Sequence, residues 1–211
     1  MWPISEGDLV FDVGANRGDF AKGCLAAGAR VVCVEPQDAM CDELALLPVD
    51  VVRAAVGASD GFVDVHVSDN SLYASARADW VDGHRGYWRW ASSGTVRVRQ
   101  VTLDGLIRKF GMPNFVKVDT EGFEDQVMAG LSTAIPAFSL EYHGGRYAVQ
   151  AAGGVTERAM RAASSLGPAY RFRFAAESNR WVSEWLPLER AVGLLDSLDW
   201  GDVYVAANGG L

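Results

Sequence analysis

A glycine-containing turn near the start of the chain has the composition of a cofactor-binding loop. Residues 12–18 read DVGANRG. The first two of them end the apolar run Leu9–Val13, and the turn follows. Gly14 and Gly18 let the backbone turn sharply and approach a ligand without an intervening Cβ. Asn16 stands where a dinucleotide fingerprint has its second glycine, so the spacing departs from Gly-x-Gly-x-x-Gly. The turn therefore favours a nucleotide-like cofactor over a nicotinamide dinucleotide.

Glu35 is the next candidate cofactor contact. It ends the apolar run Arg30–Glu35, about 20 residues after Gly14, and Pro36 follows it directly. An acid at this place in a nucleotide-binding α/β fold accepts hydrogen bonds from the ribose hydroxyls. We predict that Glu35 and Pro36 contact the cofactor. The alternative is an ordinary glycine-rich turn that binds nothing.

Asp119, Glu141 and His143 are the candidate catalytic residues. Asp119 follows the apolar run Phe115–Val118, and Glu141 and His143 lie at the end of the next run, Phe138–Tyr142. Strand ends in an open α/β sheet face the crevice where ligands bind, so we expect these side chains to meet there. Asp119 and Glu141 would then position the acceptor.

His143 is the predicted general base. Removing the proton from a substrate hydroxyl promotes transfer to that oxygen, and imidazole is suited to this near neutral pH. The other two histidines are His66, in a strand-like run, and His84, in an insertion. The alternative for His143 is a surface histidine at a strand end. The role of Lys117, two residues before Asp119, stays open.

The same acids offer oxygen ligands to a divalent cation such as Mg²⁺, which would lower the pKa of a bound hydroxyl. In that case Asp119 and Glu141 are the predicted metal ligands, with Glu121 as the alternative to Glu141. Otherwise Glu121 is predicted to contact the substrate. The alternative is that these carboxylates only balance the charge of a cofactor's amino group. Glu124 and Asp125 are expected to be first-turn helix acids rather than ligands.

Strand-like and helix-like segments alternate along the chain. The strands are expected at Leu9–Val13, Arg30–Glu35, Asp50–Val56, Phe115–Val118, Phe138–Tyr142, and an antiparallel edge pair, Tyr170–Phe174 and Val203–Ala206. The helices are expected at Phe20–Ala27, Asp38–Leu47, Leu103–Phe110, Glu124–Leu131 and Glu157–Leu166. Asp38 is the predicted N-cap of the second helix, and Gly28 is expected to end the first. This order predicts one Rossmann-like α/β domain over residues 1–211, with a mostly parallel seven-stranded sheet and helices on both faces.

An aromatic-rich insertion, residues 68–94, lies between the strand-like runs Phe62–Val67 and Thr95–Val101, which are expected to pair. An insertion of this length is usually a lid or a binding loop, here over the acceptor site. Its aromatic rings would stack on sugar rings and its arginines would bind sugar hydroxyls. The alternative is that the tryptophans close a core or bury a homodimer interface. The predicted substrate contacts are Tyr73, Arg85, Trp88 and Trp90.

The sequence resembles the FkbM family of S-adenosylmethionine-dependent methyltransferases from about Asp8 to Tyr142. The motifs that match in order are DVGAN at 12–16, VEP at 34–36, AVG at 55–57 with DG at 60–61, VTLD at 101–104 and VKVDTEGFE at 116–124. The last motif is the most distinctive, whereas the others recur widely among methyltransferases.

The resemblance implies a class I methyltransferase fold with S-adenosylmethionine as the cofactor. The implied contacts are Asp12, Gly14, Asn16 and Gly18 at the methionine end, Glu35 at the ribose, Val56 and Gly57 at the adenine edge, and Asp119 near the transferred methyl. Ser71 belongs to a short stretch that resembles the family's segment entering the cofactor site. This arrangement requires the tips of three strands, at Gly14, Glu35 and Asp119, to lie along one edge of the sheet.

Composition narrows the classes of partner. The net charge of −8 argues against nucleic acid, because phosphate contacts need clustered Lys and Arg. Three cysteines without Cys-x-x-Cys spacing suggest neither a disulfide framework nor a zinc site. The sequence has no signal-like start and no apolar run that would span a membrane, so a cytoplasmic location is expected.

The expected activity is methyl transfer to a hydroxyl of a saccharide, such as a glycolipid or polysaccharide precursor, or of another small natural product. A nicotinamide-dependent oxidoreductase is the rival enzyme class. A binding module that keeps the fold without catalysis is the rival outside enzymes, because a fold does not dictate a function.

Overall fold

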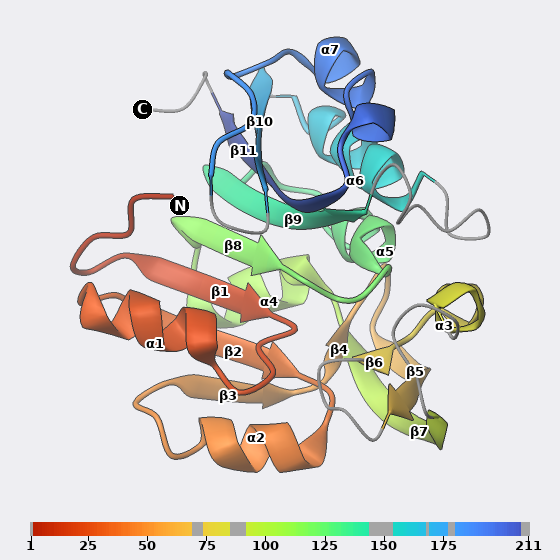
Figure 1. Ribbon diagram of the computed structural model, residues 1–211. Helices are drawn as coiled ribbons and strands as arrows, with labels where there is room; N and C mark the ends of the chain where they lie inside the picture. Colours follow the sequence, from red (N-terminus) through yellow and green to blue (C-terminus); the bar gives the residue numbers. More distant parts are fainter. Residues whose placement is uncertain are drawn as a thin grey trace.

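A seven-stranded sheet with helices on both faces forms the body of the protein (Figure 1). The computed structural model describes residues 2–68, 74–84, 92–143, 154–167, 169–176 and 180–207. In spatial order the strands are β10 (Tyr170–Ala176), β11 (Trp200–Ala207), β9 (Ala137–His143), β8 (Phe115–Val118), β1 (Leu9–Val13), β2 (Arg30–Glu35) and β3 (Asp50–Arg53). The five strands from β9 to β3 are parallel, and β11 is antiparallel to both β9 and β10. The predicted mostly parallel sheet and its antiparallel edge pair are confirmed.

The strands are apolar on both faces because each face is covered. Val10, Val31 and Cys33 belong to a core on one face, while Phe11 and Val32 belong to the core on the other. The first face packs against α1 (Asp19–Ala26) and α2 (Asp38–Leu44). The second face packs against α4 (Leu103–Phe110), α5 (Glu124–Ala129), α6 (Val155–Ser164) and α7 (Leu188–Val192). None of the helices in the described part of the chain has the length and apolar character needed to cross a membrane.

Helix α1 ends as expected, whereas α2 begins differently. Gly28 has a φ of 84° after the last turn of α1, and its amide donates to the Leu25 carbonyl. The N-cap of α2 is Gln37, so the prediction of Asp38 as the cap is wrong. Gln37 is extended, and its carbonyl already accepts the Cys41 amide, which makes Asp38 the first helical residue.

The predicted strand Asp50–Val56 is in fact two strands in two sheets. The Ala54 amide donates to the carbonyls of both Glu35 and Val52, and the chain bends away at this point. The two residues that follow form β4 (Ala55–Val56), which pairs with the end of a long strand of the second sheet. That sheet has the order β4, β7 (Ser92–Val101), β5 (Gly61–Ser68) and β6 (Ala74–Ser75), which confirms the expected pairing on either side of the insertion.

Residues 74–84 of the insertion contain β6 and the helix α3 (Ala78–His84), and hydrogen bonds attach them to the main domain. Arg77 donates from Nε to the Gly122 carbonyl at 2.6 Å and from its guanidinium to Asp125. Arg158, on α6, donates to the other Asp125 oxygen at 2.7 Å. The buried Asp125 carboxylate therefore joins the insertion, α5 and α6.

We expect Asp125→Asn to lower the free energy of unfolding by about 1.5–3 kcal/mol, the range for a hydrogen bond to a charged group. The loss arises because the half-buried Arg77 loses its anionic partner. Urea denaturation measures this change, and Asp38→Asn is the matched control because its carboxylate is 87% exposed in an ion pair with Arg53. Exposed pairs contribute about 0–1 kcal/mol. Equal losses for the two variants would contradict the fastening role of Asp125.

Candidate functional site

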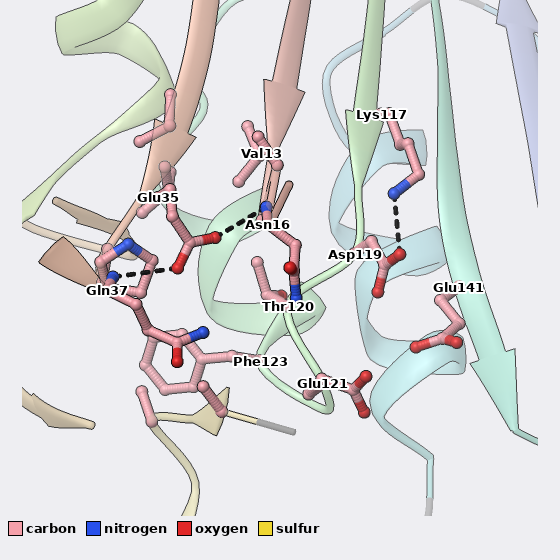
Figure 2. Close-up of a pocket in the computed structure, with 18 of the residues that line it drawn as sticks. Val13, Asn16, Glu35, Gln37, Lys117, Asp119, Thr120, Glu121, Phe123 and Glu141 are labelled. Carbon is pink, nitrogen blue, oxygen red and sulfur yellow. Dashed lines mark hydrogen bonds and ion pairs between the residues drawn. The ribbon is translucent and has the colours of Figure 1, made fainter. Parts of the chain in front are cut away.

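A cavity of about 390 Å³ lies where the carboxyl ends of β1, β2, β8 and β9 meet. In the sheet, Val13 pairs with Val34 on one side and with Val118 on the other. The residues that follow these three therefore lie side by side at the same edge of the sheet. Those residues include Gly14, Glu35 and Asp119, and all three line the cavity. Figure 2 shows Glu35 and Asp119 there. The three strand tips therefore lie along one edge of the sheet, as the sequence required.

The turn after β1 is in close contact with the tip of β8. Gly14 has a φ of 79°, and a Cβ built on it would lie 1.7 Å from the Asp119 carbonyl oxygen. Only glycine fits at this approach. Asn16 follows with a φ of 46°, a left-handed conformation that few non-glycine residues adopt. Strained backbone of this kind concentrates at ligand sites.

Two backbone amides orient the Glu35 carboxylate. The Asn16 amide donates to Oε2 at 2.9 Å, and the Gln37 amide donates to Oε1 at 2.9 Å. Burial raises the pKa of Glu35, and these two hydrogen bonds oppose the shift by favouring the anion. Pro36 and Val56 line the cavity beside it. The carboxylate is thus held with two oxygens available to a pair of neighbouring hydroxyls.

Three carboxylates gather at the other end of the cavity. Asp119, Glu121 and Glu141 each place an oxygen within 4.8 Å of the others, and all three line the cavity (Figure 2). Lys117 donates from Nζ to Asp119 Oδ2 at 2.7 Å. Burial, reinforced by the charge of Asp119, raises the pKa of both Glu121 and Glu141 well above the usual range. Such a cluster favours shared protons or a bound cation over three full negative charges.

Local hydrogen bonds stabilise the turn that carries Glu121. Glu121 has a φ of 53°, and the first residue of α5, Glu124, accepts hydrogen bonds from the Thr120 amide at 2.9 Å and the Thr120 hydroxyl at 3.0 Å. A Cβ on Gly122 would lie 2.3 Å from the Trp80 ring, so this glycine makes room for the insertion. Glu124 and Asp125 are first-turn acids as expected. The sequence did not indicate that both are buried and hold neighbouring segments together through hydrogen bonds.

His143 is a cavity-lining side chain with only 8% of its surface exposed, which argues against the alternative of a surface histidine. The edge of Trp80 contacts its ring, with centroids 4.7 Å apart. The Trp200 ring stacks on it at 6.2 Å and an angle of 12°. His143 Nε2 lies 3.9 Å from Glu141 Oε1. The imidazole is therefore held between two indoles beside a carboxylate.

Two residues of this end were not identified as site residues from the sequence. Lys117 precedes Asp119 by two positions, and that spacing places both side chains on the same face of a strand. This signal was present in the sequence. Trp200 comes from β11, where it pairs with His143 across the antiparallel ladder. No local pattern indicates that register.

Three predicted cofactor contacts do not line the cavity. Asp12 is fully buried beside Lys117, and burial raises its pKa to about 6. A Cβ on Gly18 would lie 2.8 Å from a Leu44 methyl, and one on Gly57 would clash with Gln100. These two glycines permit close packing around the site, at α2 and in the second sheet respectively. Five predicted contacts lie outside the described residues: Ser71, Tyr73, Arg85, Trp88 and Trp90.

Comparison with solved structures relates the fold to methyltransferases. A crystal structure of a TehB-like S-adenosylmethionine-dependent methyltransferase from Corynebacterium glutamicum superposes with a TM-score of 0.52 at 10% identity. The match covers 96% of this chain and 82% of that one. At this identity the likeness concerns the fold alone, and it supports the class I methyltransferase architecture.

Sequence comparison gives a more specific relationship. Hexuronic acid methyltransferase AglP of Haloferax volcanii is 27% identical over 149 residues, which are 66% of this chain. The match spans 58% of that relative's length. The model of the methyltransferase FkbM domain matches residues 12–174 and so includes the ends of β1, β2, β8 and β9 at the cavity. This chain therefore belongs to the FkbM family of S-adenosylmethionine-dependent methyltransferases.

Proposed function

We propose that this methyltransferase transfers the methyl group to a hydroxyl oxygen of a saccharide. The observation that carries the proposal is that His143 lies in the same cavity as the Gly14 turn and Glu35, at the opposite end. A base and a nucleoside-type binding site thus share one space. The sugar acceptor is supported by the relative AglP, whose name specifies a hexuronic acid. Family membership leaves no support for the rival nicotinamide-dependent oxidoreductase.

The cavity suits S-adenosylmethionine. Glu35 offers two oriented oxygens to the ribose hydroxyls, and Pro36 and Val56 provide apolar contacts for the adenine edge. The Gly14–Asn16 turn lies between these residues and Asp119, where it would hold the methionine portion. When bound, the cofactor supplies an electrophilic methyl group on a positively charged sulfur.

The residues of the chain then act on the acceptor. His143 takes the proton of the acceptor hydroxyl on a ring nitrogen, which leaves the oxygen free to attack. Asp119 and Glu141 orient the acceptor, and alignment of the two reactants supplies most of the acceleration. Trp80, from the insertion, contacts the His143 ring, which supports a role of the insertion in covering the acceptor. Glu121, which lines the same cavity, would bind a further acceptor hydroxyl.

A divalent cation at Asp119 and Glu141 is a second way to activate the hydroxyl, and the carboxylate cluster is the observation that favours it. One feature weighs against a requirement for it: the Lys117 ammonium already pairs with Asp119, at 2.7 Å. We therefore propose that the reaction proceeds without Mg²⁺.

Substitution Gly14→Ala should raise the Kd for S-adenosylhomocysteine at least about tenfold, or about 1.4 kcal/mol. The new methyl group would collide with the Asp119 carbonyl and push the tips of β1 and β8 apart. Isothermal titration calorimetry measures this affinity. Gly23→Ala is the matched control, because nothing lies within 4 Å of its Cβ position on α1. An unchanged Kd for Gly14→Ala would contradict the proposed binding site.

Substitution His143→Ala should reduce kcat by about 100-fold to 10 000-fold, the usual contribution of a general base. Binding of S-adenosylhomocysteine should stay nearly unchanged. Transfer of labelled methyl groups to a panel of saccharides, uronic acids and polyketide alcohols provides the assay and identifies the acceptor class. His66→Ala, in β5 and hydrogen-bonded to Thr95, is the control. Normal turnover by His143→Ala would reject the assignment of the base.

Treatment with EDTA should leave turnover of the wild-type enzyme within about twofold of its untreated value, because acid–base catalysis by His143 suffices. The same methyl-transfer assay measures the effect, with Mg²⁺ added back as the control. Activity that disappears with EDTA and returns with Mg²⁺ would instead assign Asp119 and Glu141 as metal ligands.

A further inference from the structure

We infer that Trp200 is a positioning residue that holds Glu141 and His143 in their working orientation. The inference rests on the proposed role of His143 as the base. Trp200 is the first residue of β11 and lies directly opposite His143 in the β11–β9 ladder. Its indole donates from Nε1 to Glu141 Oε1 at 2.7 Å. The same ring stacks on the imidazole, so one side chain contacts both groups.

The hydrogen bond determines how the carboxylate is turned. Glu141 is largely buried, and its Oε1 is the atom that lies 3.9 Å from His143 Nε2. Its Oε2 is buried and accepts no hydrogen bond from the described residues. Without the indole N–H, rotation about the carboxyl bond would no longer be restricted by that donor. The indole therefore keeps one chosen oxygen beside the imidazole.

The stacking contact restricts the base itself. Trp200 lies nearly parallel to the imidazole, and Trp80 meets the same ring at an angle of 74°. Aromatic pairs favour offset-stacked and edge-to-face geometries of this kind. Two rings from distant parts of the chain thus limit the rotation of His143. A base held in one orientation loses less entropy when it meets the hydroxyl.

Tryptophan is chemically suited to this place. The indole nitrogen only donates and carries no charge, so it orients an acceptor without competing for the substrate proton. Phenylalanine would keep a ring face and lose the donor. Lysine or arginine would add a positive charge beside the imidazole. Among these residues, only tryptophan supplies both the stacking face and a neutral donor.

The backbone next to Trp200 is fixed by close packing. Gly201 has a φ of 156°, and a Cβ on it would lie 2.1 Å from the Ala175 carbonyl oxygen of β10. This approach joins β11 tightly to the edge strand just after Trp200. The indole is therefore carried by a rigid part of the sheet, as a positioning role needs.

The first test is Trp200→Phe, which keeps a ring and removes the N–H. We expect kcat to fall about tenfold, with acceptor KM and the Kd for S-adenosylhomocysteine within about twofold of the wild type. Trp181→Phe is the matched control, because Trp181 packs against Tyr204 on the same side of the domain. Its turnover should be unchanged. Normal kcat for Trp200→Phe, or a loss confined to KM, would overturn the inference.

The second test is a double-mutant cycle with Glu141. Glu141→Gln keeps an oxygen that accepts the indole N–H, so Trp200→Phe should still lower kcat in that background. Glu141→Ala removes the acceptor, and Trp200→Phe should then have at most about a twofold effect on kcat. The urea denaturation midpoints of the same variants measure how much the hydrogen bond between Trp200 and Glu141 contributes to stability. Coupling between Trp200 and Glu141 in the urea midpoints but not in kcat would show that Trp200 contributes only to packing. That result would overturn the inference.

The proposed base and the inference about Trp200 can fail separately. Normal turnover by His143→Ala rejects the base, whatever Trp200 does. Coupling of Trp200 to Glu141 in kcat supports the positioning role through the carboxylate. Low kcat in His143→Ala with additive effects of Trp200→Phe and Glu141→Ala supports the base and overturns the positioning role.

Discussion

The close approach of the β1 turn to the tip of β8 is the constraint on which the site depends. At Gly14 the backbone lies so near the Asp119 carbonyl that no side chain fits between them. This contact joins the end of the cavity that contains Glu35 to the end that contains Asp119. Because β2 and β8 flank β1 in the sheet, one turn sets the spacing of both. Both ends therefore belong to one cavity.

Buried charge is the second feature that shapes the site. Burial opposes the charged form of Lys117, but the carboxylates of Asp119 and Asp12 outweigh it and raise the pKa of the ammonium. Burial also raises the pKa of Asp202 to about 6, with Lys117 opposing the shift. The Lys117 ammonium thus lies among three acids beside the cavity. Such a network is costly to assemble, and its placement beside the cavity points to a functional reason for keeping it.

The end of the cavity that contains His143 is assembled from segments that are far apart in the sequence. Trp80 comes from the insertion, the carboxylate-bearing turn follows β8, and Trp200 comes from the last strand. Asp125 fastens the insertion to the helices behind the sheet through Arg77 and Arg158. The end that contains Glu35 is formed mostly by the first two strand–turn units. Different parts of the fold therefore build the two ends of the cavity.

The sheet, the family and the convergence of Gly14, Glu35 and Asp119 at one cavity could all be predicted from the sequence. These rest on local signals: apolar runs, a glycine turn, and an acid at a fixed distance from it. The sequence also brought Asp119, Glu141 and His143 to one edge, because strand ends of a parallel sheet meet there. It misplaced the boundary at Ala54, where a hydrogen bond to Glu35 redirects the chain into a second sheet.

Packing between elements determines which residues of a motif reach the cavity, and the sequence did not indicate this for every residue. Asp12 and Gly18 belong to the glycine-turn motif, yet one is buried beneath the cavity and the other packs against α2. Trp200 reaches His143 through a register between strands about sixty residues apart, which no local pattern encodes. Periodicity and spacing report how a segment is buried, whereas the choice of neighbours follows from long-range pairing and packing.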